Sequence, residues 1–184
     1  EGIRAGWDEG RSHSPELWSQ LAELGVTGLL VPEAHDGMGM NEVDSVLLFE
    51  EAGRAACPEP VVATAAVAAP LLAELGNLEF AGSWLVRIGA GEAIVAVAHE
   101  VNPLVTDADL AQLLLIQRED EVHAVDPGDC EITAQPANDP SRRLFQVHFE
   151  PSDATRVAEG QPGRALWAAA LDRGALACAA QLVG

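Results

Sequence analysis

Lysine and tyrosine are missing from this chain of 184 residues, and aromatic residues make up only 4% of it. The ten basic residues are all arginines and face 29 aspartates and glutamates, which gives a formal net charge of −19 at pH 7. A field this negative repels the phosphates of nucleic acids and anionic lipid surfaces. We therefore exclude nucleic acid and the membrane surface as partners.

Cysteines and long apolar runs are also scarce. Cys57, Cys130 and Cys178 lie far apart and form no Cys-x-x-Cys pair, so neither a disulfide framework nor a zinc site is predicted. This cysteine usage fits a reducing compartment, and we expect a cytoplasmic protein. The longest apolar stretch, Val61 to Leu72, is too short for a bilayer and contains a proline, which predicts no membrane insertion.

Hydrophobic residues are abundant, at 48%, and the chain is long enough to build a core without disulfides. Their spacing in the first half is helical. Ser14 and Asn41 are predicted N-caps, the second with Asp44 as its partner in a capping box, and Gly25 follows the first helix as its C-terminal cap. We expect helices over residues 15–24, 42–57, 60–75 and 79–88.

Two details of these helices follow from the same pattern. The second helix should bury a stripe formed by Val43, Val46, Leu47 and Phe49. The third should be broken or kinked at Pro70, because proline cannot donate the backbone hydrogen bond of a helix interior.

The second half of the chain has the patterns of strands. Short apolar runs over residues 93–98 and 113–116 predict buried strands, and Phe145, Val147 and Phe149 alternate with polar residues over 144–150. Pro127-Gly128 predicts a type II turn, hence a hairpin between strands 121–125 and 130–135. We predict an α+β fold: an N-terminal helical domain (1–90), a small antiparallel β-barrel-like domain (91–160), and the start of a C-terminal helix (161–184). Since the last helix stops at Gly184 without a cap, we expect a part of a longer chain.

Candidate catalytic groups are dispersed along the chain. The five histidines are separated by unrelated elements, and none has a second ligand at metal spacing, so no metal site is predicted. His123 and His148 should face solvent from strands, whereas His99 ends a strand, where a functional role is conceivable. The run Gly37-Met38-Gly39 precedes a helix, as a dinucleotide-binding turn does, but Glu42 stands where the third glycine belongs.

Several segments, in their order and spacing, resemble the acyl-CoA dehydrogenase family. Members commonly show a Trp-x-x-Leu-Ala-Glu-Leu-Gly helix, a Val-Pro-Glu loop ending in glycines, and a Glu-Glu-x-Gly-Arg-Ala helix. The resemblance covers residues 14–98 well and the β unit in places, and residues 164–184 are similar to the first helix of the family's C-terminal domain. The segments that carry it are Leu17–Gly25, Gly28–Glu33, Asp36–Met40, Phe49–Ala55 and Pro58–Thr64.

The resemblance implies a fold and a reaction. The family has an N-terminal helical domain, a middle β-barrel domain and a C-terminal four-helix domain. Its members use FAD to desaturate an acyl-CoA thioester between the α and β carbons, with a glutamate of the C-terminal domain as the base. That base is expected beyond Gly184, so no catalytic residue is assigned in this chain.

The same resemblance implies the binding residues. Where the family has a Thr-Glu-Pro segment beside the flavin, this chain has His99 and Glu100, and a tryptophan-bearing strand pair that covers the flavin is shortened or missing here. We therefore expect His99, Glu100 and Thr106 to lie near the FAD. Gly37, Met38 and Gly39 are expected to help wall the pocket for the acyl group.

Two functions remain open from the sequence. One is a flavoenzyme that takes acyl-CoA as substrate, derived from a fatty acid or a steroid side chain. The alternative is a catalytically degenerate member that acts as a structural or binding subunit, as in heteromeric assemblies of the family; the shortened β domain suits it. The charge of −19 also disfavours a CoA ligand that carries several negative charges. In both cases we expect a homo- or hetero-oligomer with acyl-CoA dehydrogenase subunits.

Overall fold

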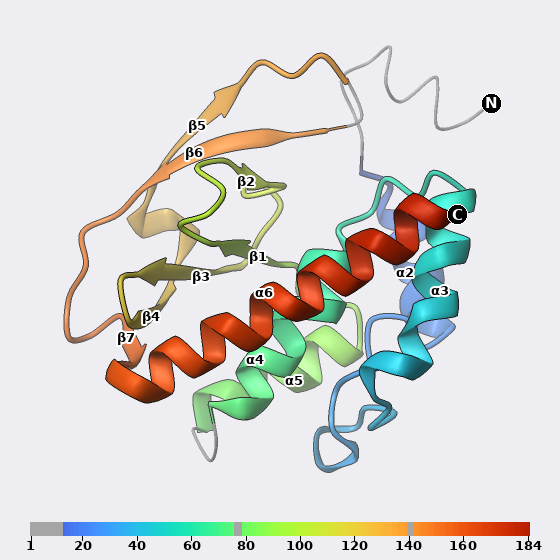
Figure 1. Cartoon of the computed structure of the whole chain (residues 1–184), viewed down its shortest axis with the longest axis horizontal. Coiled ribbons are helices and arrows are strands. Elements are labelled where there is room, and N and C mark those ends of the chain that lie inside the picture. The colour runs from blue at the N-terminus through green and yellow to red at the C-terminus, as the bar shows by residue number, and fades with distance from the viewer. Residues whose placement is uncertain (1–12, 76–78, 140–141) are drawn as a thin grey trace.

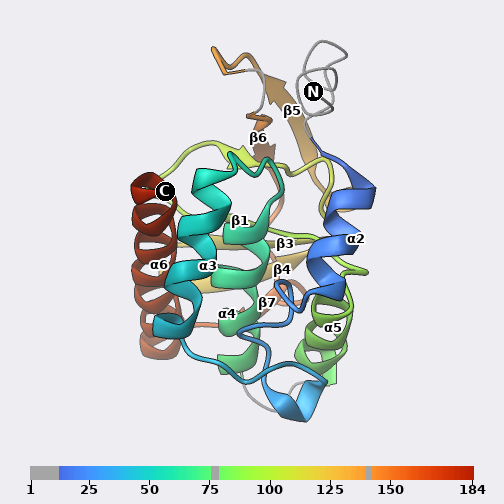
Figure 2. The ribbon, with the colours of Figure 1, turned by 90° about the vertical axis from the view of Figure 1, so that its right-hand side faces the viewer.

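The computed structural model describes residues 13–75, 79–139 and 142–184. Helices form one layer, two small sheets form another, and a long last helix runs along the outside of the helical layer (Figures 1 and 2). The helices are α2 (Pro15–Glu23), α3 (Glu42–Arg54), α4 (Ala69–Glu74), α5 (Glu79–Gly89) and α6 (Gly160–Val183). Short 3₁₀ helices lie at Glu33–His35 and Pro127–Asp129, and a π-helix lies at Val62–Ala68.

The predicted helix caps are confirmed. The Ser14 hydroxyl accepts a hydrogen bond from the Leu17 N–H at 3.2 Å, and Gly25 ends the segment with φ of +81°. At the start of α3, the Asn41 side chain accepts from the backbone of Asp44, whose carboxylate accepts from the Asn41 N–H in return. These caps satisfy N–H groups that a helix start leaves unpaired, which explains why the helices begin where they do.

The predicted buried stripe of α3 is wrong in part. Phe49 is buried, but Val43 and Leu47 are 78% and 71% exposed, and Ser45 is buried instead. The reason is that α3 packs on α6, which is far away in the sequence, and this contact selects the Ser45–Phe49 face. The helix also ends at Arg54 rather than continuing to residue 57.

The third helical stretch changes from a π-helix to an α-helix just before Pro70, the residue at which a break or a kink is predicted. A π-helix over Val62–Ala68 runs into α4, and Pro70 lies in the first turn of α4, where its missing N–H is tolerated. The Thr64 hydroxyl lies 3.1 Å from both the Val95 N and the Val95 O, so the π-helix is attached to the start of β1 (Val95–Ala98).

The strands form two sheets and confirm the α+β class. One sheet has the order β1-β3-β4-β7 and the other the order β2-β6-β5, and only the β1–β3 pair is parallel. Among the described strands the sheets do not close, so the expected barrel-like shape is corrected to two open sheets. The remaining strands are β2 (Val105–Thr106), β3 (Leu113–Arg118), β4 (Glu121–Val125), β5 (Glu131–Gln135), β6 (Leu144–His148) and β7 (Arg156–Ala158).

The predicted hairpin is wrong. β4 pairs with β3 and β7, and β5 pairs with β6 in the other sheet. The Asp126 carboxylate accepts a hydrogen bond from the Gly128 N–H at 2.8 Å, and the connection becomes a 3₁₀ turn instead of a type II turn. This turn sends the chain from one sheet to the other. The alternation along β6 is confirmed, because Phe145 and Phe149 are buried while Gln146 is exposed.

Helix α6 links the helical layer to the first sheet. Its buried residues, which include Leu166, Trp167 and Ala170, belong to the same core as Leu71 and Leu115. By length and composition alone, α6 could cross a membrane. In this fold one side of it is core, and Arg173 in its middle forms ion pairs with Glu42 and Glu74.

Candidate functional site

His99 and Glu100, the two residues after β1, form the centre of the candidate site. The His99 Nδ1 accepts a hydrogen bond from the Val101 N–H at 3.0 Å. Its ring also packs edge-to-face against the Trp167 ring of α6, with 5.7 Å between the ring centroids. Burial lowers the pKa of His99, against a smaller opposing effect of the Glu100 charge.

These contacts define the hydrogen-bonding state of His99. A nitrogen that accepts a hydrogen bond carries no proton, so the neutral ring carries its proton on Nε2. Within the described residues, Nε2 has no hydrogen-bond partner. His99 thus presents a free N–H donor at the end of β1.

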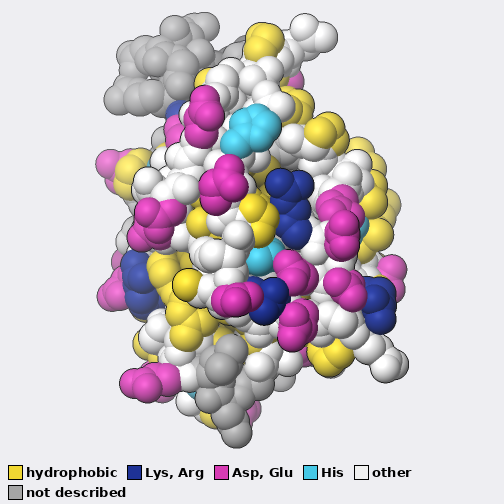
Figure 3. All heavy atoms as spheres, turned by 90° about the vertical axis from the view of Figure 1, so that its left-hand side faces the viewer, with side chains coloured by type: hydrophobic (Ala, Val, Ile, Leu, Met, Phe, Trp, Pro, Cys, Tyr) yellow, Lys and Arg dark blue, Asp and Glu magenta, His cyan; other side chains and the backbone are white. Residues whose placement is uncertain are grey.

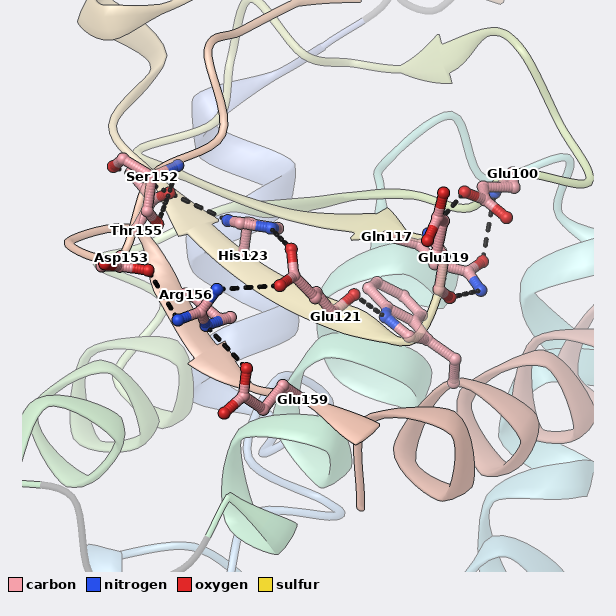
Figure 4. A network of polar contacts seen from close by, with 11 residues as sticks. Glu100, Gln117, Glu119, Glu121, His123, Ser152, Asp153, Thr155, Arg156 and Glu159 are labelled. Atoms are coloured by element: carbon pink, nitrogen blue, oxygen red, sulfur yellow. Dashed lines mark hydrogen bonds and ion pairs between the residues drawn. The ribbon is translucent and has the colours of Figure 1, made fainter. Parts of the chain in front are cut away.

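Glu100 is bound to the neighbouring turn (Figure 4). Its Oε1 accepts from the Glu119 N–H at 2.7 Å, and its own N–H donates to the Gln117 side chain at 3.3 Å. Gln117 in turn donates to the Glu119 carbonyl at 3.1 Å. Glu100 therefore ties the end of β1 to the turn between β3 and β4, which uses one of its two carboxylate oxygens.

Thr106 lies on β2, which packs against β1 and pairs Thr106 with Leu144 of β6. Its side chain is half-buried and has no hydrogen-bond partner in the described part of the chain. The fused rings of a flavin expose carbonyl oxygens and ring nitrogens that accept hydrogen bonds. Each of two donors without a hydrogen-bond partner among the described residues, His99 Nε2–H and the Thr106 hydroxyl, suits an acceptor of this kind.

The loop with Gly37, Met38 and Gly39 lies elsewhere. A Cβ on Gly37 would come within 2.1 Å of the Val31 carbonyl oxygen, and Gly39 has φ of +60°, so both glycines are required by the folding of the loop itself. Met38 is partly exposed, and Figures 1 and 2 show the loop at the end of the molecule away from β2. The structure does not bring this loop to His99, and its role at an acyl pocket stays a prediction.

The sequence missed a polar network beside the site. His123 was expected to face solvent, but it is only 1% exposed. Its two ring nitrogens lie 2.9 Å from the Glu121 carboxylate and 2.9 Å from the Thr155 hydroxyl. The cause is that Phe149 covers this face of β4, with 5.3 Å between the centroids of the His123 and Phe149 rings.

Arg156 extends this network to the surface (Figure 4). Its guanidinium binds Glu121 at 2.8 Å, Asp153 at 2.6 Å and Glu159 at 3.1 Å. Figure 3 shows charged side chains of both signs crowded on the face that carries β7 and the start of α6. The backbone carbonyl of Glu121 accepts a hydrogen bond from the Trp167 indole N–H at 2.9 Å, which links the network to the ring that contacts His99.

A second buried cluster lies next to β2. The Glu59 carboxylate is fully buried, 2.5 Å from His13 Nδ1 and 2.8 Å from the Ser14 N–H that donates to it. Asp107, directly after Thr106, adopts φ of +55°, and burial raises its pKa to about 6 although Arg143 and Arg142 oppose the rise. No group of three or more possible metal ligands occurs among the described residues.

A helical layer on small β-sheets, with a long helix across both, is the architecture of the acyl-CoA dehydrogenase class. The profile of the acyl-CoA dehydrogenase N-terminal domain matches residues 2–92. The chain belongs to the acyl-CoA dehydrogenase family.

Particular relatives agree with this assignment. The acyl-CoA dehydrogenase IpdE2 of Mycolicibacterium smegmatis is 30% identical over 188 aligned positions, which cover 100% of this chain and 54% of the relative. The chain thus spans about half the length of the curated relatives it matches.

Solved structures show the same fold. A steroid acyl-CoA dehydrogenase named Tcur3481-Tcur3483 has a TM-score of 0.79 at 22% identity, covering 97% of this chain and 56% of that one. A glutaryl-CoA dehydrogenase from Mycobacterium smegmatis in complex with FADH2 has a TM-score of 0.68 at 18% identity, covering 98% and 58%.

Proposed function

We propose that this chain is the N-terminal and middle part of an FAD-dependent acyl-CoA dehydrogenase that desaturates an acyl-CoA thioester. The observation that carries the proposal is the family match over residues 2–92, in a chain whose fold extends the likeness through its sheets and α6. The FADH2 bound to the glutaryl-CoA dehydrogenase supports a flavin as the cofactor. The steroid dehydrogenase among the structural neighbours supports a bulky acyl group as one class of substrate.

The described residues would bind and orient the flavin cofactor rather than transfer protons. A bound flavin would supply a hydride acceptor for the β carbon of the acyl group, and a base would remove the α proton. From the family resemblance we expect that base beyond Gly184. Here His99 Nε2–H and the Thr106 hydroxyl would donate hydrogen bonds to the cofactor, and the buried cluster that includes Val105 and Phe145 would exclude water beneath β2.

The test is the visible spectrum of the full-length protein that carries this chain, recorded before and after denaturation. We expect one flavin per chain and bleaching of its absorbance when a suitable acyl-CoA is added without oxygen. A panel of straight-chain and steroid-derived thioesters identifies the acyl class. Full-length protein that neither contains nor takes up FAD, alone or with a partner subunit, would refute the proposal.

A second candidate function is a structural or binding subunit of a heteromeric dehydrogenase. The observations that support it are the two open sheets, together with a structural neighbour, Tcur3481-Tcur3483, that is named as two proteins. Co-expression with candidate dehydrogenase subunits and purification through a tag on one of them separates the two functions. A stable hetero-oligomer in which only the partner reacts with acyl-CoA supports the subunit, whereas an active homo-oligomer excludes it.

A further inference from the structure

We propose that Trp167, on α6, is a positioning residue that fixes the imidazole of His99 as a hydrogen-bond donor to the bound flavin. This inference rests on the proposed function only for the identity of the acceptor. The contact between the two rings is a property of the chain itself.

The first step is that Trp167 is itself held firmly. Its side chain is among the largest fully buried ones in the core, and its indole N–H donates to the Glu121 carbonyl at 2.9 Å. Glu121 cannot move easily, because its strand pairs with β3 and its carboxylate binds His123 and Arg156. The indole therefore projects from α6 in one orientation.

The second step is that His99 is held from two directions. The Val101 N–H fixes Nδ1 as the acceptor, and the Trp167 ring lies nearly perpendicular to the imidazole, with an interplanar angle of 87°. Edge-to-face contacts of this kind contribute about 0.5–1.5 kcal/mol beyond area burial. Together they leave Nε2–H as the free donor and restrict the ring to one rotamer.

The third step is chemical. A neutral imidazole that donates from Nε2 suits an acceptor atom such as a flavin carbonyl oxygen or ring nitrogen. Partial burial against Trp167 keeps His99 neutral, because a charged ring would lose hydration there. Glu100, which follows His99 directly and binds the turn that carries Glu119, favours the protonated ring, but the effect of burial on the pKa is larger.

The experiment compares Trp167→Leu with Trp84→Leu in the full-length protein. Trp84 is a half-buried tryptophan on α5 that contacts Arg87 and has no contact with His99, so it is a matched control. Histidine NMR, with the His99 signal assigned from His99→Gln, reports the tautomer and the titration midpoint. Flavin titration reports the dissociation constant for FAD.

In Trp167→Leu we expect a His99 titration midpoint that moves up, broadened His99 ring signals because the imidazole samples other rotamers, and about tenfold weaker FAD binding, equivalent to ~1.4 kcal/mol. Trp167→Phe, which keeps a ring but loses the N–H, should restore most of the wild-type His99 signal. Trp84→Leu should change none of the three readouts. An unchanged His99 signal in Trp167→Leu, or an equal change in Trp84→Leu, would overturn the proposal.

A reciprocal variant covers the case in which Trp167→Leu does not fold. His99→Ala removes a half-buried side chain at the end of β1. It should shift the NMR signal of the Trp167 indole N–H, while the indole signals of the other tryptophans stay in place. An unmoved signal counts against the contact. If the His99 effects appear but wild-type protein binds no FAD, the positioning role stands, and both the flavin acceptor and the proposed function fail.

Discussion

At the scale of single residues, Glu59 is the buried carboxylate among the described residues. One of its oxygens lies 2.5 Å from His13 Nδ1, and the other accepts a hydrogen bond from the N–H of Ser14, the N-cap of α2. Glu59 thus connects the start of α2 to the segment just before the π-helix at Val62–Ala68. A buried acceptor with two donors is far harder to replace than a surface ion pair.

We predict that Glu59→Ala lowers the free energy of unfolding by about 2 kcal/mol, because it leaves two half-buried donors, His13 and the Ser14 N–H, without their acceptor. Urea denaturation measures this directly. Glu51→Ala is the control, since Glu51 is an exposed partner of Arg54 and its loss should change stability by less than ~0.5 kcal/mol. Equal effects of the two substitutions would contradict the buried role of Glu59.

Asp107 should make stability depend on pH. Its pKa rises from 3.8 to about 6 in the folded state, so between these values the folded chain holds a proton that the unfolded chain has lost. Stability therefore falls as the pH rises through this window, by up to about 3 kcal/mol, and is level above it.

The matched variant is Asp107→Asn, which keeps a neutral side chain and tolerates the positive φ. Urea denaturation at pH 4 and pH 7 should show that the free energy of unfolding falls less with rising pH in this variant than in the wild type. Asp120→Asn, at a surface ion pair with Arg164, should retain the wild-type decline. If the free energy of unfolding falls equally in Asp107→Asn and in the wild type, other titrating groups cause the pH dependence.

At the scale of elements, α3 and α6, which are far apart in the sequence, cross at very short range. A Cβ on Gly53 would lie 2.0 Å from the Gln181 carbonyl oxygen, so the two backbones touch at this point. The same contact turns the Ser45–Phe49 face of α3 inward. The approach is possible only because position 53 has no side chain.

We predict that Gly53→Ala destabilises the protein by about 2 kcal/mol or more, although alanine favours a helix. Gly174→Ala, on α6, is the control. A Cβ there meets only the Val67 methyl at 3.5 Å, so helix propensity should dominate and stabilise by up to ~1 kcal/mol. Thermal unfolding of both variants gives opposite shifts if the crossing is as close as described.

At the scale of the whole molecule, net charge opposes compactness. Ten arginines cannot neutralise 29 acidic residues, and the ion pairs described above join only a few of them. Repulsion among the remaining carboxylates destabilises the folded chain, and salt screens it.

We predict that raising NaCl from about 10 mM to about 0.5 M increases the melting temperature at pH 7 by several degrees. Near the isoelectric point of about 4.3 the same addition should have little effect, since the net charge is then close to zero. Differential scanning calorimetry at both pH values tests this. A melting temperature that falls with salt at pH 7 would show that attractive pairs outweigh the repulsion.

The sequence by itself determined the local features: the caps at Ser14 and Asn41, the alternation around Phe145, and the motifs that identify the family. Each depends on hydrogen bonds or spacing within a few residues, so the neighbouring residues in the sequence suffice to predict it. The tertiary structure alone decided which strands pair, that His123 is buried, and that Trp167 meets His99. Those outcomes depend on which segments, many residues apart in the sequence, pack into the same core. The local pattern of residues does not determine that choice.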